Sequence, residues 1–95
     1  MSSRRANQWK WFSAKVLEHI EGYTVPQYGD YPDDLCTGMT VENLRMQLKK
    51  YTARLGNNAR GQVEGLRDLL KIAHYACMLY SKEIDGDGLS TKFSE

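Results

Sequence analysis

The stretch GQVEGLRDLLKIAHYACMLYSK, residues 61–82, decides the fold class. Its apolar residues return at alternating intervals of three and four positions, which is the period of an α-helix and of a heptad seam. These residues are Val63, Leu66, Leu70, Ala73, Cys77 and Tyr80. Further apolar residues between them widen the stripe to more than half of the helix circumference. The pattern predicts a helix over 61–82 that forms the centre of an all-α fold.

A second helix is predicted directly before it, over residues 40–55. Thr40 is a good N-cap, because its hydroxyl can accept a hydrogen bond from a free backbone N–H of the first turn. Gly56 follows the helix and tolerates the left-handed backbone that often ends one. The apolar seam consists of Val41, Leu44, Leu48, Tyr51 and Leu55. Since the connection to residue 61 is short, we expect 40–82 to form an αα-hairpin.

The N-terminal part predicts a third helix over residues 6–22, ended by Gly22 and followed by Pro26. Its apolar stripe consists of Trp9, Phe12, Val16, Ile20 and Tyr23. We assign Trp9 and Phe12 to the core, and expect the helix to pack across the hairpin. The result is a three-helix bundle in one domain, residues 1–84. Residues 23–39 are expected to form a long loop packed over the helices, and residues 85–95 a mobile tail.

The composition fits a small globular domain. The chain has 95 residues, of which 41% are hydrophobic and 26% charged, so a disordered chain is not expected. No apolar run reaches the length of a membrane span, and no hydrophobic signal core follows Arg4 and Arg5. We therefore expect a cytoplasmic protein without a membrane partner, in which Cys36 and Cys77 are free thiols.

Charge is segregated along the chain, although the net charge is only +1. Residues 16–44 carry six acids and no Lys or Arg, whereas residues 45–71 carry seven basic residues and two acids. Such blocks create local fields that favour association. The candidate binding residues lie in the loop and around the hairpin turn: Tyr28, Asp30, Tyr31, Asp33, Asp34, Lys50, Arg54, Arg60 and Arg67.

The sequence holds no complete catalytic or metal-binding motif. The tail resembles a calcium loop around Gly88, but Ser90 and Ser94 stand where an apolar residue and a bidentate Glu are required. His19 and His74 have no acid, nucleophile or cysteine at a catalytic or zinc-binding spacing, and both are expected on the surface. We therefore expect no cofactor and no metal.

Two alternatives have some support from the residues. The basic residues around the hairpin turn could hold nucleic-acid phosphates, although the chain is far less basic than most nucleic-acid-binding domains. The segment around Asp68 resembles the second metal-binding helix of the all-α NTP pyrophosphatases, where a Glu-x-x-Asp pair faces magnesium. Here Gly65 occupies the glutamate position and Glu64 is one residue out of phase, so that site would lack a ligand.

Three phrases carry a second resemblance: HIEGYTVPQYGD (19–30), YTARLGNNARG (51–61) and RDLLKIAHYA (67–76). Together they resemble small proteins encoded by bacteriophages and prophages. The resemblance implies no activity and no site residues, but it implies a bacterial cytoplasm as the setting. From the residues, we expect a non-catalytic interaction protein that binds a protein partner or itself through its acidic and basic surfaces.

Overall fold

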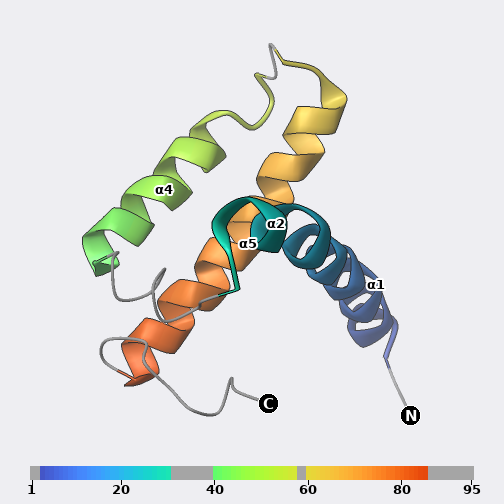
Figure 1. Ribbon diagram of the computed structural model, residues 1–95. Helices are drawn as coiled ribbons and strands as arrows, with labels where there is room; N and C mark the ends of the chain where they lie inside the picture. The colour runs from blue at the N-terminus through green and yellow to red at the C-terminus, as the bar shows by residue number, and fades with distance from the viewer. Residues whose placement is uncertain (1–2, 31–39, 58–59, 86–95) are drawn as a thin grey trace. The chain divides into compact units, whose positions relative to one another are not determined.

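The computed structural model describes residues 3–30, 40–57 and 60–85 (Figure 1). Every regular element in these ranges is helical, which confirms the all-α class. The elements are α1 (Arg4–His19), the π-helix η1 (Ile20–Thr24), α2 (Val25–Tyr28), α4 (Val41–Ala53) and α5 (Gln62–Asp85). No helix in these ranges is both long enough and apolar enough to cross a membrane.

The chain divides into two compact units, Met1–Asp30 and Tyr31–Glu95, and each is described by itself. The expected single domain, with the first helix packed across the hairpin, therefore stays a prediction.

The first unit is one helical run that is longer than the sequence pattern predicts. Ser3 caps α1 by accepting a hydrogen bond from the Ala6 backbone N–H at 3.0 Å. The predicted end at Gly22 is wrong, and so is the loop over residues 23–28, because helical structure continues to Tyr28. Pro26 lies at the start of α2, directly after the π-helix, and the helical run continues through it. The glycine that ends the run is Gly29, whose φ of 90° L-residues rarely adopt.

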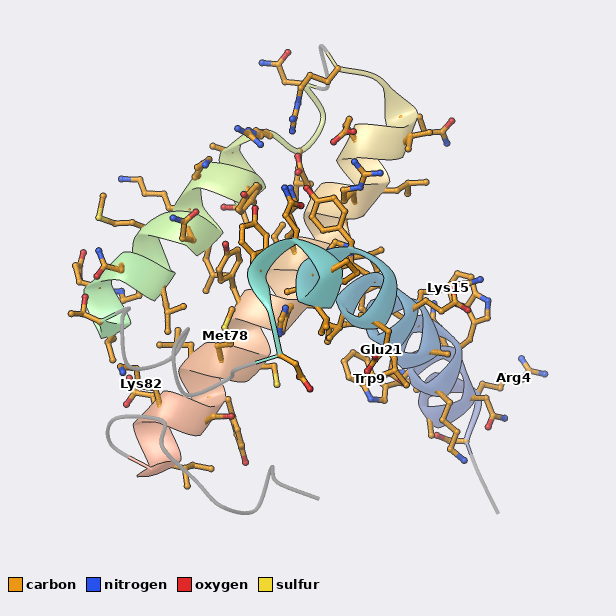
Figure 2. All side chains as sticks on the ribbon, in the orientation of Figure 1. Arg4, Trp9, Lys15, Glu21, Met78 and Lys82 are labelled. Carbon is orange, nitrogen blue, oxygen red and sulfur yellow. The ribbon has the colours of Figure 1, made fainter. Side chains whose placement is uncertain are left out.

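Two residues of this unit lie in environments other than the ones predicted from the sequence. His19 is buried rather than on the surface, and its ring stacks on Tyr23 at a centroid distance of 5.0 Å. Trp9 is 61% exposed, so it is not a core residue, although its ring lies 5.8 Å from that of Phe12. Figure 2 labels Trp9 on α1, together with the basic side chains Arg4 and Lys15.

The second unit contains the αα-hairpin (Figure 1), which is antiparallel as the short connection predicts. Thr40 caps α4 as expected, and its hydroxyl forms a reciprocal capping box with Asn43. Leu44 is fully buried and packs with Met78, which Figure 2 labels on α5. The N-terminal end of α4 therefore packs against the C-terminal half of α5.

The face of α5 that is buried is not the apolar stripe predicted from the sequence. Its buried positions are Gly65, Asp68, Met78 and Lys82. Tyr75 lies on the same face and stacks on Tyr51 of α4, with centroids 5.8 Å apart. Cross-hairpin contacts made by Asp68 and Tyr75 thus set the rotation of α5, and they turn most of its heptad stripe outward.

Candidate interaction site

Charged side chains gather at the end of the hairpin where the turn connects α4 to α5. We name this group the hairpin-end cluster. Its members come from the last turn and the C-cap of α4, from the turn two residues before α5, and from the first turns of α5. They are Lys50, Tyr51, Arg54, Arg60, Glu64, Arg67, Asp68 and Lys71.

Asp68 is the buried centre of the cluster, with a residue exposure of 1%. Its Oδ1 lies 3.8 Å from Nη1 of Arg54 and 3.6 Å from Nη2 of Arg60. These distances are too long for hydrogen bonds, and Oδ1 accepts none from the described residues. A buried carboxylate is costly without compensating charge, so the two guanidinium groups stabilise it electrostatically.

Glu64 extends the cluster along α5. Nη1 of Arg67 donates a hydrogen bond of 2.7 Å to Oε1 of Glu64, and Nη1 of Arg60 lies 3.8 Å from Oε2. Arg60 therefore lies close to both carboxylates. Because this residue precedes α5, the two ion pairs fix the approach of the turn to the helix.

The aromatic ring of Tyr51 is the apolar part of the cluster, and this residue is buried. Three cationic groups lie close to its ring: those of Lys50 at 5.0 Å, Arg54 at 5.1 Å and Lys71 at 5.3 Å from the centroid. The electron-rich ring attracts each of them. Three positive charges therefore lie around the same ring.

The cluster carries an excess of positive charge. It contains five cationic side chains and two carboxylates, and both carboxylates already face arginines. The excess positive charge creates an electrostatic potential that favours an anionic partner.

A second surface lies along α5, and we name it the outer seam. Val63 is 70% exposed, Leu66 is 55% exposed and Tyr80 is 69% exposed. Leu69 and Ile84 are exposed as well, and the free thiol of Cys77 lies between them in the sequence. The outer seam shares Val63, Leu66, Cys77 and Tyr80 with the heptad stripe predicted from the sequence. The other two members of that stripe, Leu70 and Ala73, are half-buried.

His74 of α5 is half-buried, not fully solvated as predicted. Burial lowers the pKa of its imidazole below the ordinary value, because desolvation disfavours the charged form.

The structure brings together four of the predicted binding residues, Lys50, Arg54, Arg60 and Arg67, around Tyr51, Glu64 and Asp68. Tyr28 and Asp30 are exposed in the other unit. Tyr31, Asp33 and Asp34 lie outside the described residues, as do Cys36 and the tail residues after Asp85.

Sequence reasoning did not assign Asp68 and Tyr51 to the site. Asp68 directly follows Arg67, so nothing in the sequence alone marked it as a buried charge.

The structure offers little support for a magnesium site at Asp68. In the described ranges no three acidic, histidine or cysteine side chains gather where they could hold a metal ion. Glu64 and Asp68 both face guanidinium groups, and these positive charges compete with a cation for the carboxylates.

Comparison with protein-family models, with curated proteins and with solved structures found no match. The function therefore has to be argued from the chemistry of the two surfaces.

Proposed function

We propose that this chain is a small, non-catalytic interaction protein that binds a protein partner, in the first instance a second copy of itself, through the outer seam of α5. The observation that carries the proposal is the exposure of Val63, Leu66 and Tyr80 on the face of α5 that α4 does not cover. Exposed apolar side chains that recur along one face of a helix favour an association site there.

The spacing of the outer seam favours another helix as its occupant. From Val63 to Ile84 the seam extends over three heptads, which corresponds to about 32 Å of helix. Intervals of three and four residues match the knobs-into-holes packing of paired helices. A second copy of the chain presents the same seam, so a two-fold pairing of α5 buries both seams at once.

The segregated charges have a separate role in this proposal. The acids within residues 16–44 would attract the basic residues of the hairpin-end cluster in a partner, which would orient the two molecules and speed their encounter. Apolar burial would supply most of the affinity. Association through the outer seam should then persist at high salt, whereas association through charge alone should weaken.

The resemblance to phage- and prophage-encoded proteins supports a setting in the cytoplasm of a bacterial host. In that setting a small interaction protein would act as an accessory factor during infection.

The proposal is tested by sedimentation velocity over a range of protein concentrations. The double variant Leu66→Gln/Tyr80→Gln should remain folded and lose the association of the unsubstituted chain, because both side chains are exposed within one copy. Met46→Gln is the matched control, since Met46 is 60% exposed but lies on α4. Equal association in all three proteins would exclude the outer seam as the interface.

A further inference from the structure

We propose that the hairpin-end cluster is a phosphate-binding site, in which the guanidinium groups of Arg54 and Arg60 are the direct donors. The ligand class is a phosphate group, either of a free phosphate compound or of a nucleic-acid backbone. The site is distinct from the outer seam and does not depend on self-association.

The first argument is that the donors are available. Arg54 and Arg60 approach Asp68 only at 3.8 Å and 3.6 Å, and Arg60 approaches Glu64 at 3.8 Å. None of these contacts is a hydrogen bond. Within the described ranges, the guanidinium N–H groups of Arg54 and Arg60 therefore remain able to donate to a ligand.

The second argument is that the two guanidinium groups are already gathered before any ligand arrives. Both lie beside the same buried oxygen of Asp68, although Arg54 is at the end of α4 and Arg60 is in the turn before α5. Their side chains are 37% and 52% exposed, so a ligand can reach them from solvent. Because the two guanidinium groups are already close together, the entropic cost of ordering them on ligand binding is lower.

The third argument is electrostatic. Lys50 and Arg54 lie within 5.1 Å of the Tyr51 ring centroid, and Lys71 lies at 5.3 Å. An anion that binds near this ring is attracted by all three cations. The ligand therefore gains attraction from lysine charges as well as from arginine hydrogen bonds.

Phosphate is the anion that fits this donor set best. A phosphate group offers several oxygens in a tetrahedral arrangement, and planar guanidinium groups bind such oxygens in pairs. Two arginines from different elements can contact different oxygens of one phosphate, while the lysines act as point charges. A carboxylate offers only two oxygens and a single charge.

The test uses the full chain at low ionic strength, with inorganic pyrophosphate and a short single-stranded oligonucleotide as separate probes. Binding is measured by calorimetry, and arginine side-chain N–H resonances are followed by NMR. We expect both probes to shift the resonances of Arg54 and Arg60. Arg60→Gln should weaken binding about tenfold, because it removes charge-assisted hydrogen bonds.

Arg45→Gln is the matched control. It removes the same charge from the same unit, but Arg45 is exposed and pairs only with Glu42 at 3.7 Å among the described residues. We expect binding in this variant to stay within about twofold of the unsubstituted chain. Arg54→Gln is the second test variant, and circular dichroism checks the folding of all three proteins.

Two results would overturn the proposal. Either neither probe binds at low salt, or Arg45→Gln weakens binding as much as Arg60→Gln, which would show attraction by net charge alone. Tighter binding of the oligonucleotide than of pyrophosphate would support the site and assign it to nucleic acid. The reverse order would support it and assign it to free phosphate compounds.

Discussion

Asp68 shows how one residue can determine the geometry of a surface. It is almost fully buried, and the charges that compensate it come from Arg54 and Arg60, which are partly exposed. Neutralising the carboxylate leaves the arginines facing one another without their shared counter-charge. The burial of Asp68 therefore links the stability of the hairpin to the arrangement of its basic residues.

Asp68→Asn should lower the free energy of unfolding by about 1–2 kcal/mol, less than for a fully buried ion pair because water screens the arginines. Urea denaturation measures the change. Glu42→Gln is the matched control, since Glu42 and its partner Arg45 are both exposed, and we expect a change below about 0.5 kcal/mol. Equal changes in the two variants would contradict a central role for Asp68.

His74 should make stability depend on pH. Its pKa is lowered in the folded state by burial, so the unfolded chain takes up the proton first as the pH falls. The contribution of the neutral imidazole is complete above the unfolded pKa of about 6.5 and is lost progressively as the pH falls toward the folded pKa.

Denaturation curves at several pH values between neutral and mildly acidic check this prediction. The unsubstituted chain should lose stability more steeply than His74→Gln as the pH falls below about 6.5. Identical slopes for the two proteins over this interval would show that His74 does not contribute.

At the scale of elements, helix α5 is an example in which the sequence predicts the fold class correctly but not the face of the helix that is buried. The intervals of three and four residues give the helix and the hairpin correctly, because periodicity and turn chemistry are local properties. The rotation of α5 about its own axis is not local. It depends on Tyr51 stacking on Tyr75 and on Asp68 meeting Arg54, contacts between residues far apart in the sequence.

The same reasoning explains what was predicted of the site. Lys50, Arg54, Arg60 and Arg67 could be grouped because the short turn brings the ends of the two helices together. The buried partners Asp68 and Tyr51 could not be added without knowing which face of α5 is covered. Four members of the outer seam belong to the stripe that the sequence predicts, but their exposure follows only from that rotation.

The helical run of the first unit offers a test at the scale of an element. Gly22 is helical, and a Cβ built on it would meet no atom within 4 Å. Gly22→Ala should therefore stabilise the run by about 0.5–1 kcal/mol, because alanine loses less backbone entropy than glycine.

Thermal unfolding followed by circular dichroism measures this change, and Gly29→Ala is the opposite control. Gly29 has a positive φ of 90°, so alanine there should destabilise the end of the run. A destabilising Gly22→Ala substitution would indicate that the run ends at Gly22, as the sequence pattern alone predicts.

At the scale of the whole molecule, the chain combines two kinds of surface on one hairpin. The hairpin-end cluster concentrates positive charge around a buried carboxylate, and the outer seam exposes apolar side chains along α5. A chain of 95 residues buries only a modest core by itself, so pairing of the seams would add apolar burial that one copy lacks. This pairing is the central claim about function.

The most direct test of that claim is the solution mass of the purified chain, measured by light scattering at low and at high salt. One chain has a mass of 10.9 kDa. The outer-seam proposal predicts a defined oligomer whose mass is retained at high salt, because apolar contacts hold it. A monomer at both salt concentrations, over the full range of protein concentration, would contradict self-association through the outer seam.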